Sequence, residues 1–186
     1  MAISATQVRD LRQATGVGMM ECKKALEETS GDIDQAIILL RERGLARAAK
    51  KAGRTAADGL VAFSIADDAK SAVLVEINCE TDFTAKNDEF RAFVSSVAKA
   101  ALAAKAGSVE ELSAVAFNGS TVGEQLGQLI AKIGENMNLR RVQSFTIANG
   151  FIAGYSHMGG RIGTLVVCEG DSSTKAREVG MDLALH

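Results

Sequence analysis

The segment SAVLVEINCETDFTAKNDEF, residues 71–90, decides how the middle of this chain folds. Its first nine residues are rich in β-branched side chains, which favours a strand, and a helical pattern begins near Asn87. Between them lies a polar connection with one aromatic residue, Phe83, in a chain that has seven Phe, one Tyr and no Trp. Phe83 can be the first inward-facing residue of a helix or an exposed side chain that contacts another molecule. Composition and periodicity leave both open.

The flanking residues extend this pattern to a hairpin followed by a helix. The stretch LVAFSIA alternates, with Val61, Phe63 and Ile65 on one side of a strand, and the DDAK that follows is typical of a turn. After the second strand, Asn87 or Asp88 can cap a long alanine-rich helix. The apolar face expected for this helix consists of Phe90, Phe93, Val94 and Val97.

The first 44 residues have the pattern of three short helices. Ser4 and Gln7 form a capping-box pattern at the start of the first helix, and the TGVG stretch that closes at Gly18 ends it. The third helix is expected to begin at Asp32 and to end at Gly44. A bundle this small buries little surface, so we interpret it as a compact binding module.

Two features of this N-terminal region are candidates for contacts with other molecules. Met19 and Met20 are adjacent at the start of the second helix, so both cannot face the centre of one small core. At least one is expected to be core, and the other to be an exposed, adaptable contact residue. The basic, alanine-rich segment 45–59 is expected to be a solvated connector with a helical start.

Residues 136–170 predict three more strands. Asn149-Gly150 is a strong two-residue hairpin signal, and SHMGG, residues 156–160, predicts a second turn. A last helix is expected from Ser172, and the sequence reaches His186 without a glycine or polar stop signal.

These patterns predict an α+β fold. The order hairpin then helix occurs in residues 59–106 and again in residues 138–186, which indicates two related α+β halves. We therefore expect three parts. They are a helical module with its basic linker (1–54), a first α+β half (55–137), and the start of a second, incomplete half (138–186).

The composition argues against several classes of function. The chain is 47% hydrophobic and 24% charged, as folded soluble proteins are, and its net charge of −2 lacks the positive excess of a dedicated nucleic-acid binder. No apolar run reaches the roughly 18 residues of a membrane helix, and the N-terminus lacks a signal-peptide pattern. Three cysteines without Cys-x-x-Cys spacing are expected to be free, buried thiols, which favours a cytoplasmic location.

The sequence holds no recognisable set of catalytic residues. Gly16-Val17-Gly18 and Gly159-Gly160 lack the flanking residues of a phosphate-binding loop. The two histidines, His157 and His186, are far apart and have no metal-type spacing. We therefore expect a protein that is not an enzyme, needs no metal or cofactor of its own, and acts through its surfaces.

Four stretches, in order, resemble signatures of the bacterial translation elongation factor Ts family. They are LRQATGVGMMECKKALEETSGDIDQAI, EINCETDFTAKNDEF, AKIGENMNLRR and YSHMGGRIGTLV, and the resemblance extends over residues 3–186. It implies a guanine-nucleotide exchange factor that binds elongation factor Tu carrying GDP and expels the GDP so that GTP can bind. It also implies that the N-terminal helices are similar to ubiquitin-associated domains, and that the second half is incomplete compared with longer members.

The resemblance also implies roles for particular residues. The segment that would dislocate Mg²⁺ from the partner consists of Thr81, Asp82, Phe83 and Thr84. The residues that would bind the partner are Met19, Met20, Lys23, Ile133, Gly134 and His157. None of these is expected to be catalytic or to hold a metal.

Two other functions stay open on the residues alone. The N-terminal helices could form an adaptor that binds peptides or ubiquitin-like proteins without releasing nucleotide. The basic residues of segment 47–54 and Arg140-Arg141 could bind RNA, with an affinity that falls as salt rises. The resemblance instead favours elongation factor Tu as partner, without direct binding of nucleic acid or membrane. The sequence allows a homodimer but does not indicate one.

Overall fold

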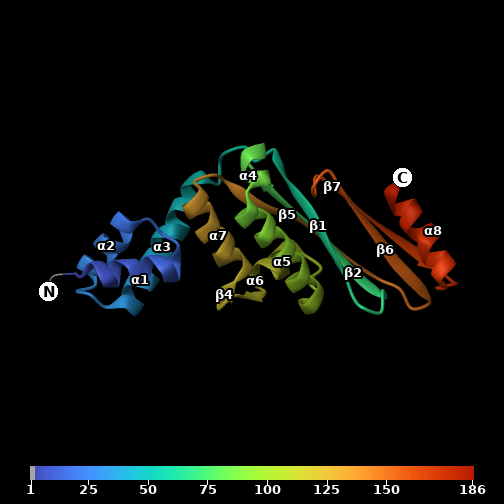
Figure 1. Cartoon of the computed structure of the whole chain (residues 1–186), viewed down its shortest axis with the longest axis horizontal. Helices are drawn as coiled ribbons and strands as arrows, with labels where there is room; N and C mark the ends of the chain where they lie inside the picture. The colour runs from blue at the N-terminus through green and yellow to red at the C-terminus, as the bar shows by residue number, and fades with distance from the viewer. Residues whose placement is uncertain (1–2) are drawn as a thin grey trace. The chain divides into compact units, whose positions relative to one another are not determined.

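The computed structural model describes residues 3–186 and confirms the α+β class, with helices packed beside antiparallel strands (Figure 1). The chain divides into two compact units. The first runs to Gly53 and takes in Gly127–Glu135, and the second comprises Arg54–Leu126 and Asn136–His186. None of the helices in the described residues is long and apolar enough to cross a membrane.

Three N-terminal helices form most of the first unit: α1 (Ala5–Thr15), α2 (Met19–Glu28) and α3 (Ile33–Lys51). The capping box of α1 is confirmed, because Gln7 N donates to Ser4 Oγ at 3.2 Å and Ser4 N donates to Gln7 Oε1 at 3.0 Å. Gly16 ends α1 with φ +68°, and Asp32 caps α3 as expected. The buried core of these helices consists of Val8, Leu11, Cys22, Ala25, Leu26, Ala36 and Leu40.

The expected end of α3 at Gly44 is wrong, because the helix continues to Lys51. Residues 45–51 are mostly alanine, arginine and lysine, which are strong helix formers and outweigh the cost of about 1 kcal/mol for one internal glycine. Gly44 is buried, and a Cβ placed there would lie 3.5 Å from the Cβ of Ala131. This is an ordinary contact distance, so Gly44 lies packed inside the helix and does not terminate it.

An ion pair joins α2 to α3 on the surface of the first unit. The Arg47 guanidinium donates to both carboxylate oxygens of Glu21, at 2.5 and 2.7 Å. This hydrogen bonding holds the pKa of Glu21 below its ordinary value. The folded state therefore binds a proton at Glu21 less readily than the unfolded chain does, so the pair stabilises the fold above about pH 4.5. The stabilisation is lost as the pH falls through the lowered pKa.

Substituting Glu21→Gln should therefore have a small effect that depends on pH. Because both side chains are partly exposed, we expect a loss of less than about 1 kcal/mol in the free energy of unfolding at neutral pH. The difference from the unsubstituted protein should shrink as the pH falls through the lowered pKa of Glu21, where the folded state also becomes protonated. Urea unfolding over a series of pH values measures it, with the exposed Glu42→Gln as control. A difference that persisted at low pH would contradict the role of the ion pair.

All the strands of the described residues lie in the second unit. Its elements, with α7 divided between the two units, are β1 (Asp58–Ile65), β2 (Ser71–Cys79), α4 (Asp82–Lys86), α5 (Asp88–Ala104), α6 (Val109–Ala114), β3 (Ala116–Phe117), β4 (Ser120–Thr121), α7 (Val122–Ile133), β5 (Met137–Thr146), β6 (Gly150–His157), β7 (Ile162–Glu169) and α8 (Thr174–Leu185). The antiparallel sheet has the order β1-β2-β5, and β6 pairs with β7 in a separate ribbon.

Helix α5 covers one face of the sheet, against β1 and β2 (Figure 1). Asn87 caps it as expected, with its side chain accepting from Glu89 N and Phe90 N at 2.9 and 3.2 Å. Buried side chains recur on every second residue of β2, at Val73, Val75 and Ile77, which the twofold period of a strand brings to one face. On α5 the buried residues are Phe90, Val94, Val97, Ala98 and Ala101.

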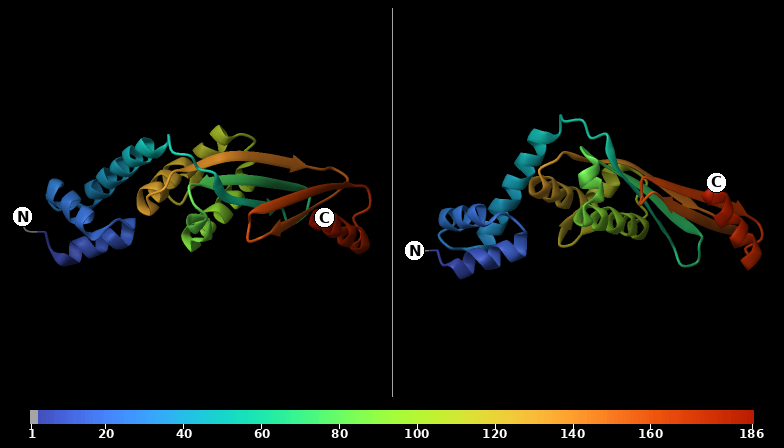
Figure 2. Two further views of the ribbon diagram at one scale, coloured as in Figure 1. Left: turned by 90° about the horizontal axis from the view of Figure 1, so that it is seen from above. Right: turned by 45° about the horizontal axis from the view of Figure 1, so that its top comes forward.

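The β6–β7 ribbon packs beside β1, and the two further views show it next to this strand (Figure 2). The close approach of this ribbon to β1 depends on two glycines. A Cβ at Gly154 would lie 2.7 Å from Phe63 Cε2, and one at Gly163 would lie 2.8 Å from Val61 Cγ1. The backbone hydrogen bond from Val61 N to Gly160 O, at 2.7 Å, holds the ribbon's turn against the strand.

The expected Asn149-Gly150 hairpin is wrong. Strand β5 pairs with β2, whereas β6 pairs with β7, so these residues join two sheets instead of two paired strands. Gly150 is needed for another reason: its φ is +136°, and a Cβ there would lie 1.9 Å from the carbonyl oxygen of Cys168. The second expected turn, between β6 and β7, is confirmed.

Helix α8 packs against β6 and β7, and the Arg177 guanidinium lies 5.4 Å from the ring centre of Phe151. The Cys22 and Cys79 thiols are buried, as expected, whereas the Cys168 thiol is only half-buried. The division into a module and two related α+β halves stays a prediction.

Candidate functional site

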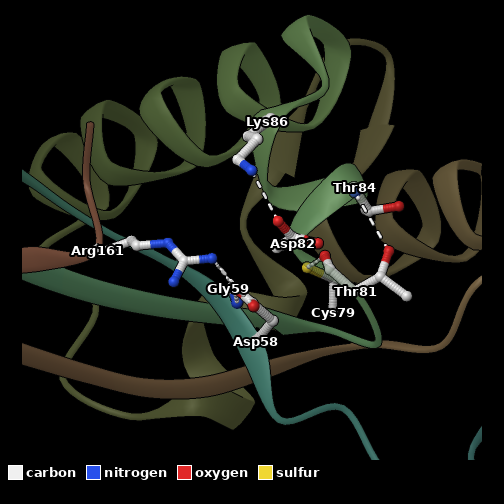
Figure 3. A network of polar contacts seen from close by, with 8 residues as sticks. All are labelled: Asp58, Gly59, Cys79, Thr81, Asp82, Thr84, Lys86 and Arg161. Atoms are coloured by element: carbon white, nitrogen blue, oxygen red, sulfur yellow. Dashed lines mark hydrogen bonds and ion pairs between the residues drawn. The ribbon is translucent and has the colours of Figure 1, made fainter. Parts of the chain in front are cut away.

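The polar connection after β2 forms a short capped helix. Thr81 is the N-cap of α4: its Oγ1 accepts a hydrogen bond from Thr84 N at 3.4 Å, and its carbonyl oxygen accepts one from Ala85 N at 3.2 Å. The buried Cys79 thiol donates to the same carbonyl oxygen at 3.2 Å (Figure 3). At the other end, Asn87 N donates to Thr84 O, so α4 is held on both sides. The connection between β2 and α5 is therefore helical, which periodicity had left open.

Phe83 lies on the outer side of α4 and is 81% exposed. This is the highest exposure among the exposed large apolar residues of the described chain. Phe90, seven residues later, is 0% exposed. The question of which phenylalanine is core is thus settled in favour of Phe90. Thr84 is only 5% exposed, so it supports α4 from inside and cannot form part of a contact surface without rearrangement.

Asp82, beside Phe83, is held by the next turn of the helix. Lys86 Nζ lies 2.7 Å from Asp82 Oδ2, an i,i+4 pair on the surface. The Lys86 ammonium, with a weaker contribution from Arg161, keeps the pKa of Asp82 below its ordinary value. An ionised carboxylate therefore stands next to an exposed aromatic ring. Lys86 and Arg161 were not identified from the sequence, because lysine and arginine are common at surfaces.

The turn between β6 and β7 lies in the same unit and carries His157. The Tyr155 hydroxyl lies 3.2 Å from His157 Nδ1, and the two rings stack with their centres 5.9 Å apart. The next residue, Met158, is 64% exposed. Arg161 follows the turn and donates to both carboxylate oxygens of Asp58, at 3.1 and 3.2 Å (Figure 3). This pair links the turn to the start of β1, on the side where α4 lies.

In the first unit, both methionines at the start of α2 are exposed, Met19 by 49% and Met20 by 64%. The expectation that one is core is wrong. Gly18 is the N-cap of α2, so the two occupy the first turn, while the buried face begins at Cys22. Lys23 is also exposed and lies 3.7 Å from Glu27.

Ile133 and Gly134, at the end of α7, are half-buried. Gly134 has φ +91°, as a helix stop requires, and its carbonyl oxygen accepts a hydrogen bond from Lys51 Nζ. Within residues 3–186 no group of three or more His, Cys, Asp or Glu side chains is arranged to hold a metal ion. The predicted partner-binding role of these residues stays a prediction.

Comparison with known proteins identifies the family. The family model described as Elongation factor TS matches residues 80–186, which include α4, α7 and the β6–β7 turn. This chain belongs to the elongation factor Ts family.

Many curated proteins named Elongation factor Ts resemble this family member along nearly all of its length. One from Clostridium botulinum (strain Alaska E43) is 51% identical over 186 residues, covering 99% of this chain and 61% of that protein. One from Methylococcus capsulatus is 50% identical over 187 residues, covering 100% and 62%. One from Halothermothrix orenii is 47% identical over 189 residues, covering 100% and 63%. The chain thus spans about three fifths of the length of the elongation factors Ts it matches.

Proposed function

We propose that this protein is a guanine-nucleotide exchange factor for elongation factor Tu. It would act in translation elongation in the cytoplasm, without being an enzyme or holding a cofactor. The observation that carries the proposal is Phe83, an exposed aromatic ring on a capped helix within a chain of the elongation factor Ts family. Water surrounds this apolar ring in the free protein, so a partner surface that buried it would gain free energy.

The proposed action is directed at the partner's Mg²⁺. In GTPases this ion bridges phosphate oxygens and protein side chains and contributes much of the affinity for GDP. The Asp82–Phe83 pair would enter the partner beside that ion, with the ring displacing neighbouring residues and the carboxylate adding a negative charge. No covalent chemistry is required. The exchange factor only has to bind the nucleotide-free partner more tightly than the GDP-bound partner.

The free energies involved indicate how different residues would share the task of weakening GDP binding. Weakening GDP binding a thousandfold requires a coupling free energy of about 4 kcal/mol, and GDP must weaken the protein complex by the same factor. Burial of one phenylalanine supplies about 1.5–3 kcal/mol. Phe83 is therefore too small to act alone. We assign the anchoring to the N-terminal module, through Met19, Met20 and Lys23, and to Ile133, Gly134 and His157.

The direct test is stopped-flow release of fluorescent GDP from elongation factor Tu, with and without this protein, at several Mg²⁺ concentrations. We expect strong acceleration that becomes smaller as Mg²⁺ rises, because the free ion opposes its own displacement. Binding without acceleration would support a helical adaptor instead. Salt-sensitive binding of RNA without acceleration would support an RNA-binding protein.

A further inference from the structure

A polar cluster lies immediately before the cap of α4. Glu80 stands between the end of β2 and Thr81, and its Oε1 accepts a hydrogen bond from Asn136 N at 2.6 Å. Arg54 Nη1 lies 3.5 Å from the same oxygen. The Glu80 side chain is 21% exposed, so its carboxylate is directed mainly into the protein. A hydrogen bond this short to an ionised acceptor belongs to the stronger class in proteins.

Asn136 holds the other side of the cluster. It is 1% exposed, and its Nδ2 donates to the carbonyl oxygen of Arg54 at 2.7 Å. Three segments distant in sequence therefore meet here within the second unit: the residues before β1, the end of β2, and the residue before β5. A buried amide with its donors satisfied fixes local geometry, because leaving a buried group unpaired costs more than the bond itself contributes.

The short helix needs such an anchor. Five residues are far too few for a helix to be stable by itself in water, so the orientation of α4 depends on the burial of Thr84 and Ala85 and on what holds its two ends. Asn87 leads directly into α5 and holds the C-terminal end. At the N-terminal end, Thr81 closes the first turn, and the adjacent Glu80 connects this end to Asn136 and Arg54 through its charged side chain.

We propose that Glu80 is a positioning residue for nucleotide exchange. By accepting the hydrogen bond from Asn136 N, it holds the N-cap of α4 in place and thereby fixes the direction in which Phe83 points. The proposal rests on the proposed function as far as exchange is concerned. The orientation of residue 83 can also be tested without any partner.

The exchange arm of the test is a double-mutant cycle with Glu80→Ala, Phe83→Ala and the double variant. Glu80→Ala should slow stimulated GDP release about tenfold, the effect of losing one charge-assisted hydrogen bond. Its affinity for the nucleotide-free partner should change less. The double variant should be no slower than Phe83→Ala, because Glu80 acts through that ring. Glu80→Gln keeps an acceptor oxygen for Asn136 N and should retain most of the activity.

The control is Glu76→Ala. Glu76 lies on β2, the strand that ends just before Glu80; its side chain is 20% exposed, and it forms a 2.6 Å ion pair with Arg141. It is thus matched to Glu80 in residue type, burial and pairing, but it does not adjoin α4. We expect GDP release with Glu76→Ala to equal that of the unsubstituted protein. Equal slowing by the two alanine variants would mean a general structural effect and would overturn the proposal, as would additive losses in the cycle.

The second arm needs no partner. The chain has no tryptophan, so Phe83→Trp introduces a single reporter at the tip of α4. Its fluorescence anisotropy should fall when Glu80→Ala is added, and should stay unchanged with Glu76→Ala. Unchanged anisotropy with Glu80→Ala would refute the positioning role even if exchange were slowed. If the unsubstituted protein failed to release GDP while the anisotropy fell as expected, the proposed function would fail and the positioning of α4 would stand.

Discussion

Substituting Phe83→Ala is expected to slow stimulated GDP release about 10- to 100-fold, the rate equivalent of the 1.5–3 kcal/mol gained by burying the ring. The ring is 81% exposed in the free protein, so its apolar surface becomes buried only in a complex. The affinity for the nucleotide-free partner should fall less, because the residues that we propose to anchor the complex lie elsewhere. Stopped-flow release and equilibrium binding of elongation factor Tu measure the two quantities.

Phe83→Ala should leave the fold intact, with the free energy of unfolding changed by less than about 0.5 kcal/mol, as is usual for surface substitutions. Leu183→Ala removes another exposed apolar side chain, 57% exposed on α8, and serves as the control for nonspecific effects. It should not alter GDP release. Release that was unaffected by Phe83→Ala would rule out the ring as the part that displaces Mg²⁺.

Substituting Phe90→Ala is expected to lower the stability of the fold and to leave GDP release largely unchanged. Phe90 is 0% exposed on α5, and truncating a buried phenylalanine costs about 3–5 kcal/mol. For a chain of this size we expect the melting temperature to fall by about 10 °C. Differential scanning calorimetry and urea unfolding measure the loss. Assays run well below the lowered melting temperature should still show GDP release, because Phe90 is buried and not part of the exposed surface.

Phe90→Leu is the matched control for this prediction. It keeps much of the apolar volume and should cost less than Phe90→Ala, because the loss grows with the size of the cavity left behind. A stability change as small as that of Phe83→Ala would contradict the burial of Phe90. The same substitution at two phenylalanines seven residues apart should thus have different effects. At Phe83 it should slow GDP release, and at Phe90 it should lower stability.

Local signals in the sequence predicted much of the secondary structure. The capping box of Ser4 and Gln7, the Asp32 cap and the Asn87 cap all form as expected. So does the β1–β2 hairpin. These features depend on hydrogen bonds between residues close together in the chain, so their residue types and spacing are visible in the sequence.

Other expectations failed where distant segments decide the outcome. Gly44 looked like a helix end, but it lies inside α3 and packs beside Ala131 of α7. Asn149-Gly150 looked like a hairpin, but β5 finds its partner in β2 and β6 finds its partner in β7. A turn signal specifies a local reversal of the chain; it does not specify which strands supply hydrogen bonds across it.

At the candidate site, too, the sequence revealed some features and contacts between distant segments decided others. The TDFT motif was recognised by its resemblance to a family, and with it the residues expected to act on the partner. Yet the sequence did not reveal that Thr84 is buried. It also did not reveal that Glu80 is tied to Asn136 across 56 positions of the chain. Such contacts carry no local periodicity or spacing.

The sequence by itself therefore indicated most of the longer helices and strands, the family and the motif with Phe83. Only the tertiary structure decided that Phe83 is exposed while Phe90 is buried, and that α4 is anchored at both ends. The physical reason is that caps and alternation depend on neighbours along the chain. Burial instead depends on which distant segments pack over a side chain, and no short stretch of sequence contains that information.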